Sequence, residues 1–153
     1  MKNKFIILAL LTLSACGFKP LYAQVTAEEL AKIHINEIPT YDGQIVRNEL
    51  QDLFASTGND YTLDVKLLKE RRGVGIQEDF RVSRLDIILE ADYTLTSNLD
   101  KQVLVKDRSI VYSSFDRTES EFSTFVAEED ASRLAAQEVA FEIRSKIAAY
   151  FSR

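Results

Sequence analysis

Side chains able to do covalent or acid–base chemistry are few in this chain of 153 residues, which has one histidine, His34, and one cysteine, Cys16. A Ser–His–Asp triad or a zinc site needs partners that cannot be assembled around a single histidine. The "GVG" at residues 73–75 lacks the spacing of a phosphate-binding loop, and no helix is predicted after it. The acidic residues fall mainly on predicted strand faces and helix starts, where solvated carboxylates are usual. We therefore predict no enzymatic activity, no metal site and no bound cofactor.

Basic side chains concentrate in residues 69–84, "KERRGVGIQEDFRVSR", which we predict to be a hairpin loop. This segment contains five basic and three acidic residues, although the whole chain has a formal charge of −5. The planar guanidinium of arginine matches the geometry of phosphate groups, so one interpretation is a contact for an anionic ligand. The other is a solvated loop with local ion pairs of little energetic value. The candidates for the first interpretation are Arg71, Arg72, Arg81 and Arg84.

Cys16 ends a stretch that is typical of an export signal. Two lysines precede the apolar run "FIILALLTL", residues 5–13, and two small residues follow it. A transmembrane helix needs about 20 apolar residues, so this run is too short to be one. "LSAC" resembles the bacterial lipobox, whose cysteine is acylated and becomes the first residue of a mature lipoprotein. An exported protein with one cysteine would otherwise carry an unpaired thiol, so we predict a signal peptide at 1–15 and covalent lipid (palmitate) on Cys16.

The residue after the cysteine and the charge of the mature chain bear on location and partners. Gly17 stands where lipoproteins retained in the inner membrane often have aspartate, which favours the outer membrane. Removing residues 1–15 takes away two lysines and no acid, so the formal charge falls from −5 to −7. An acidic protein has no general attraction for nucleic acid. We predict attachment to a membrane through the lipid and no nucleic-acid partner.

The rest of the chain predicts regular elements, because glycine and proline are scarce. Residues 16–28 are predicted to be the lipidated cysteine and a tether, and residues 29–153 a single domain. Alternating apolar residues predict four strands, within residues 32–39, 61–70, 83–97 and 102–118, the last with an irregularity near Asp107. Helical spacing predicts a helix between Asp42 as N-cap and Gly58 as C-terminal stop, and a second one at residues 123–151.

The last predicted helix has an apolar stripe formed by Ala135, Val139, Ala140, Ile143, Ile147 and Tyr150. Each predicted strand has one apolar and one polar face, which favours a largely antiparallel sheet covered on one side. The order β-α-β-β-β-α therefore predicts an α/β (α+β) two-layer sandwich, in which two helices cover one face of a four-stranded mixed sheet. The other face of the sheet is predicted to be polar and partly open.

Three features together resemble the LptE family of lipopolysaccharide-assembly lipoproteins, in a form similar to that of alphaproteobacteria. They are the lipobox leading into "CGFKPLY", the order of the elements, and the ending "FVAEEDASRLAAQEVAFEIRSKIAAYF". The resemblance covers the mature chain. It implies a lipoprotein on the periplasmic side of the outer membrane, a plug and assembly subunit of the β-barrel LptD that helps to insert lipopolysaccharide into the outer leaflet.

The resemblance also implies a ligand for the arginines, since the lipid A part of lipopolysaccharide carries phosphates. Basic residues near the start of the strand after the loop bind lipopolysaccharide in relatives, and Arg81 and Arg84 occupy that region. A second basic position before the final helix of some relatives has no clear counterpart, because residues 123–126 are uncharged and the nearest cation is Arg117. Two alternatives stay open: a lipoprotein that binds or carries an anionic lipid without a barrel, and, against the single histidine and absent thiol, a periplasmic hydrolase.

Overall fold

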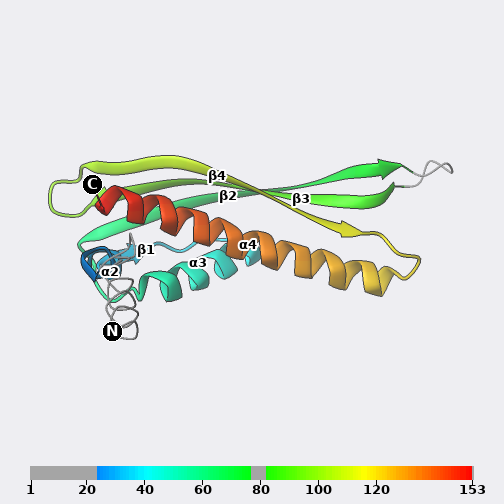
Figure 1. Ribbon diagram of the computed structural model, residues 1–153, viewed down its shortest axis with the longest axis horizontal. Helices are drawn as coiled ribbons and strands as arrows, with labels where there is room; N and C mark the ends of the chain where they lie inside the picture. The colour runs from blue at the N-terminus through cyan, green and yellow to red at the C-terminus, as the bar shows by residue number, and fades with distance from the viewer. Residues whose placement is uncertain (1–23, 77–81, 153) are drawn as a thin grey trace, which may run out of the picture.

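The computed structural model describes residues 24–76 and 82–152, which form an elongated α+β sandwich (Figure 1). Within these residues a four-stranded sheet is covered on one face by helices, as predicted. The elements, in chain order, are α2 (Gln24–Ala31), β1 (Ile33–Ile35), α3 (Tyr41–Phe54), β2 (Tyr61–Ile76), β3 (Val82–Ser97), β4 (Val103–Asp116) and α4 (Glu121–Phe151).

The sheet has the order β1-β2-β3-β4, with β1 parallel to β2 and the other neighbours antiparallel. Strands β2 and β3 have 16 residues each, which is about 50 Å of extended chain. The prediction of a loop over residues 69–84 was therefore wrong, because β2 continues to Ile76 and β3 begins at Val82. The glycines of "GVG" lie at two register shifts inside this hairpin rather than in its turn. Arg71 and Arg72 are strand residues as a result.

The core lies between the covered face of the sheet and the helices α3 and α4, and the long α4 runs beneath most of the sheet (Figure 1). Ile87, Leu89 and Tyr93 alternate along the covered face of β3 and are almost fully buried. The predicted stripe of α4 is confirmed, with all of its members fully buried except Tyr150, which is partly exposed. Alanines in this stripe let the helix backbone approach the sheet closely, so that larger side chains from β3 fill the space between them.

The ends of α3 differ from the prediction. Its N-cap is Thr40, whose hydroxyl accepts a hydrogen bond of 2.9 Å from the backbone N–H of Gly43. Asp42 lies inside the first turn instead, where its charge suits the helix dipole. The helix ends at Ala55, in the left-handed region with φ of 49°. Gly58 has another role, because a Cβ there would lie 2.7 Å from the backbone Cα of Lys32.

Two further features were not predicted correctly. The irregularity expected near Asp107 is absent, since the pairing of β3 with β4 is regular from residue 105 to 116 and shifts at Leu95 and Thr96 instead. Helix α2 was not predicted, and it spans the expected boundary between tether and domain. It is joined to the fold by Leu30, which is buried in the core, and by the carbonyl of Ala31, which accepts two backbone hydrogen bonds.

The same substitution, leucine to alanine, should change the free energy of unfolding by different amounts in the core and on the outer surface of the sandwich. Leu50 of α3 is fully buried, and Leu134 of α4 is 55 % exposed. We expect Leu50→Ala to lower the free energy of unfolding by about 2–5 kcal/mol, because it leaves a cavity, and Leu134→Ala to change it by no more than about 0.5 kcal/mol. Urea unfolding followed by circular dichroism measures both. Equal losses in the two variants would contradict the packing described here.

Candidate functional site

The alternation of side chains along the strands divides the predicted arginines between the two faces of the sheet. Arg71 follows Leu63 and Val65 at odd positions of β2, on the face that the helices cover. Arg72 and Arg84 lie at even positions of β2 and β3, on the open face. The predicted arginines therefore do not form one cluster, although Arg71 and Arg72 are adjacent in sequence.

Arg71 lies near the C-terminal end of β2 and links the sheet to the N-terminal part of α4. Its guanidinium donates to the Glu128 carboxylate, with the shorter N···O distance at 3.1 Å. The neighbouring cation on this face, Lys69, forms an ion pair of 3.1 Å with Asp42 in the first turn of α3. Both helices therefore place acids against this basic row. Arg71 remains more than half exposed despite this contact.

A groove of about 380 Å³ lies between this end of the sheet and α4. Arg71 from β2 and Arg117 from the β4–α4 connection both line it. Arg117 forms an ion pair of 3.5 Å with Glu121, one turn along. Phe125, 62 % exposed, adds an aromatic surface. The described lining residues are Arg71, Leu85, Arg117, Glu121, Thr124, Phe125 and Glu128.

The groove combines two guanidinium groups, two carboxylates and an apolar wall, so it can receive a ligand that has both phosphate and hydrocarbon parts. Such an anion would have to displace Glu121 and Glu128. The displacement costs little, because exposed ion pairs contribute only about 0–1 kcal/mol. Arg117 was noted in the sequence as the nearest cation to the last helix, but it was not predicted to lie beside the same groove as Arg71. The signal that could have done so is the β3–β4 register, in which Arg84 pairs with Asp116.

The other predicted site residues lie elsewhere. Arg84 forms an ion pair of 3.3 Å with Asp116, and Arg72 lies 3.9 Å from Glu70, both on the open face. Arg81 and Cys16 fall outside the described residues. Their predicted roles, in binding an anionic ligand and in carrying a lipid, stay predictions.

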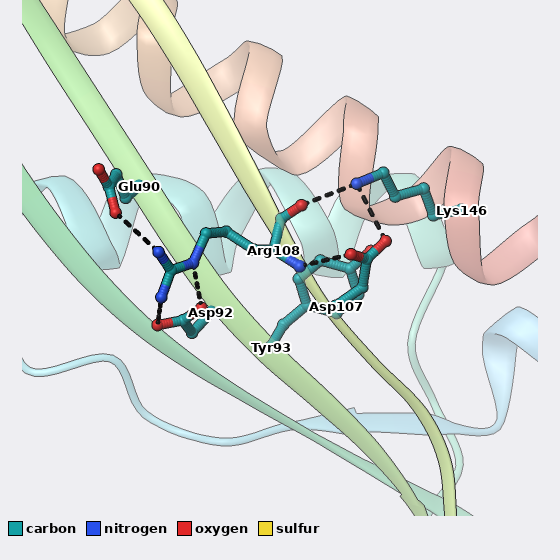
Figure 2. Close-up of polar contacts among 6 residues, drawn as sticks. All are labelled: Glu90, Asp92, Tyr93, Asp107, Arg108 and Lys146. Carbon is teal, nitrogen blue, oxygen red and sulfur yellow. Dashed lines mark hydrogen bonds and ion pairs between the residues drawn. The ribbon is translucent and has the colours of Figure 1, made fainter.

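The open face of the sheet carries charges in rows across the strands. Lys66, Asp92 and Arg108 are register partners on β2, β3 and β4. Arg108 donates to both oxygens of Asp92, at 2.6 and 3.0 Å, and its guanidinium also lies 3.5 Å from Glu90 (Figure 2). The hydrogen bond from Arg108 holds the pKa of Asp92 below its usual value. A shallow hollow of about 620 Å³ follows these rows. This face carries many charged side chains, and the three arginines Arg72, Arg84 and Arg108 are paired with carboxylates on it.

A second polar group lies at the edge of β4, where α4 passes beneath it. Lys146 of α4 is 3.0 Å from Asp107 and donates a hydrogen bond of 2.8 Å to the backbone carbonyl of Arg108 (Figure 2). Asp107 accepts from the backbone N–H of Arg108 at 2.7 Å, which with Lys146 lowers the pKa of this carboxyl. Tyr93 donates to Asp107 from the core at 3.4 Å, and burial raises the pKa of its hydroxyl.

No set of three or more histidine, cysteine and carboxylate side chains is placed to hold a metal ion within residues 24–76 and 82–152. In the same part of the chain, no helix is both long and apolar enough to cross a membrane. What the described surface offers is an open charged face, a groove with two arginines, and the edge of a long sheet.

The family of the chain follows from its sequence. Residues 30–147 match the family model described as LptE, lipopolysaccharide-assembly. This chain belongs to the LptE family. The match begins at the end of α2 and reaches almost to the end of α4, so it covers the whole sandwich. No curated protein matches the sequence significantly.

Solved structures show the same fold in other bacterial proteins. A candidate lipoprotein from Caulobacter crescentus CB15 superposes with a TM-score of 0.70 at 21 % identity, over 82 % of this chain and 95 % of that one. A minor lipoprotein from Acinetobacter baumannii has a TM-score of 0.61 at 16 % identity, over 78 % and 92 % of the two chains. The rare lipoprotein B of Shewanella oneidensis has a TM-score of 0.59 at 12 % identity, over 77 % and 92 %. The LptE-type sandwich is thus kept while most of the sequence differs.

Proposed function

We propose that this LptE-family protein is a lipoprotein of the outer membrane, held on the periplasmic side by lipid on Cys16. In this proposal it plugs the β-barrel LptD, assists the assembly of that barrel, and helps it to insert lipopolysaccharide into the outer leaflet. The observation that carries the proposal is the open face of the sheet, which no described helix covers and on which Arg108 pairs with Asp92 and Arg84 with Asp116 across neighbouring strands.

The physical argument concerns the inside of a large barrel. Such a lumen is polar, so the surface of a plug must be polar too. On the open face, Arg108 already has Asp92, and Arg84 already has Asp116. Exposed pairs of this kind can exchange partners with a barrel wall at small cost, which suits a subunit that must dock without catalysing a reaction.

A second function has its own support, from the groove at the far end of the sheet. A free lipoprotein that binds or carries an anionic lipid would need cations beside an apolar wall, and Arg71, Arg117 and Phe125 provide these. The two functions are compatible, because a plug can also contact the lipid that passes through its barrel.

Affinity purification of the tagged protein from detergent-solubilised outer membrane tests the plug proposal. We expect one large β-barrel protein at equal stoichiometry, identified by mass spectrometry and by the ratio of band intensities. A different outer-membrane lipoprotein with the same tag serves as the control. Recovery of the protein without any barrel, alone or with bound lipid, would move the assignment to the free lipid-binding lipoprotein.

The lipid anchor is tested separately by labelling growing cells with an alkyne analogue of palmitate. We expect the wild-type protein to be labelled and to sediment with membranes, and Cys16→Ser to lose both properties, since the chain has no other cysteine. Residual labelling of the serine variant would place the acyl chain elsewhere in the protein.

Two double variants of equal charge test where lipopolysaccharide binds. We expect Arg71→Ala with Arg117→Ala to weaken binding of the purified protein to lipopolysaccharide at least about tenfold, because each charge-assisted hydrogen bond contributes about 1.5–3 kcal/mol. Arg72→Ala with Arg84→Ala removes the same charge from the open face and serves as the matched control. Binding measured by displacement of a fluorescent lipopolysaccharide distinguishes them. A larger loss in the control pair would move the lipid contact to Arg72 and Arg84 on the open face.

A further inference from the structure

The outer edge of β4 has one stretch whose outward backbone groups make no hydrogen bond to another element of the described protein. β4 is the last strand of the sheet, so half of its backbone groups point away from β3. Arg108 identifies which half, because its N–H donates to Asp107 and its C=O accepts from Lys146 (Figure 2). In an antiparallel strand the N–H and C=O of a residue point the same way, and the direction alternates. The outward groups after Arg108 thus belong to Ile110, Tyr112 and Ser114.

Asp107 and Lys146 close the edge at Arg108, but only there. Within residues 24–76 and 82–152, the outward N–H and C=O groups of Ile110, Tyr112 and Ser114 have no hydrogen-bond partner. The pairing with β3 is regular through this stretch, so no bulge turns the edge away. Natural edges are usually blocked by charges, proline or bulges. Here the contacts of Asp107 and Lys146 end at Arg108, so the edge of the strand is open from Ile110 onward.

The side chains of the open stretch favour contact with another backbone. No charged residue occurs between Arg108 and Asp116. On the open face, Tyr112 is 65 % exposed and Ile110 is 41 % exposed. Ile88, directly across from Tyr112 on β3, is only 4 % exposed although no helix covers this face. These side chains make an apolar patch at the edge of an otherwise charged face.

We propose that Ile110–Ser114 is a strand-addition site, on which an uncharged, extended loop segment of the barrel partner adds as a fifth strand. An extended backbone is the occupant that matches outward groups on alternate residues, and the stretch spans about 17 Å, or five residues. Apolar side chains of the added strand would continue the patch of Ile88, Ile110 and Tyr112. This inference rests on the proposed plug function, which supplies the partner.

The size of the stretch decides between a barrel segment and a second copy of this chain. A stable interface buries at least about 1,000 Å², and five residues of paired edge cannot supply that alone. The edge therefore suits one part of a larger contact, such as that of a plug inside its barrel.

Proline scanning of β4 tests the inference, because proline removes one backbone N–H and is tolerated on an edge only where that N–H faces outward. We expect Tyr112→Pro to keep a cooperative urea transition, and to reduce the barrel recovered by affinity purification about fivefold or more, as one or more hydrogen bonds of about 1 kcal/mol are lost. Tyr112→Thr keeps the N–H and removes the ring, so it should recover more barrel than Tyr112→Pro. Val111→Pro removes an inward N–H and should not fold cooperatively.

Each result bears on the strand-addition site. Full recovery of the barrel with folded Tyr112→Pro would overturn it and leave the plug function standing. Equal losses in Tyr112→Pro and Tyr112→Thr would overturn it too, because the ring rather than the backbone would then make the contact. Loss of cooperative folding in Tyr112→Pro would show that its N–H faces β3. A wild-type dimer that Tyr112→Pro converts to a monomer would make a second copy the occupant. If wild type recovers no barrel, the plug function itself fails.

Discussion

The packing of α4 against β3 and β4 is the contact on which the rest of the structure depends. The helix has 31 residues, about 46 Å, and lies along a sheet of similar length. Its small residues Ala135 and Ala140 bring the backbone close to the sheet, while Ile143 and Ile147 fill the space beside them. Helix α3 then closes the remaining apolar surface of the same face. The hydrophobic stabilisation of the domain therefore comes from one side of the sheet, and the other side is left free for polar contacts.

This one-sided core explains why the two faces of the sheet have different chemistry. On the covered face, helices supply partners for polar side chains of the sheet, as Glu142 does for buried Ser109. On the open face, charges face one another across the strands and stay in water. The contrast is strongest on β4, whose odd positions face α4 and whose even positions face solvent. Asp107 and Arg108, adjacent in sequence, thus contact Lys146 of α4 on the covered side and Asp92 of β3 on the open face (Figure 2).

Sequence patterns were enough to predict the sandwich, because alternation and helical spacing report directly on burial. They located the buried stripe of α4 and the covered face of β3 from the residues alone. They failed at positions where backbone geometry, rather than the pattern of apolar residues, determines the role of a residue. Thr40 caps α3 in place of Asp42 because the cap depends on backbone angles, and Gly58 is required by a close approach to Lys32 that no local pattern reveals. Helix α2 has only eight residues, too few for a clear period.

The arginines show the same limit at the candidate site. The sequence shows a run of basic residues, which was predicted to be a loop. Because the run is part of a strand, in which neighbouring side chains point to opposite faces, Arg71 and Arg72 lie on different faces of the sheet. Arg117, 46 positions from Arg71 in the chain, joins it because β4 returns beside β3 to the same end of the sheet. A site that forms where one strand runs back antiparallel to its neighbour depends on strand length and register. Neither is determined by composition, and at this end of the sheet β4 leads directly into α4, which forms the other wall of the groove. The position of the groove is therefore a consequence of the core, even though the core contains none of its charges.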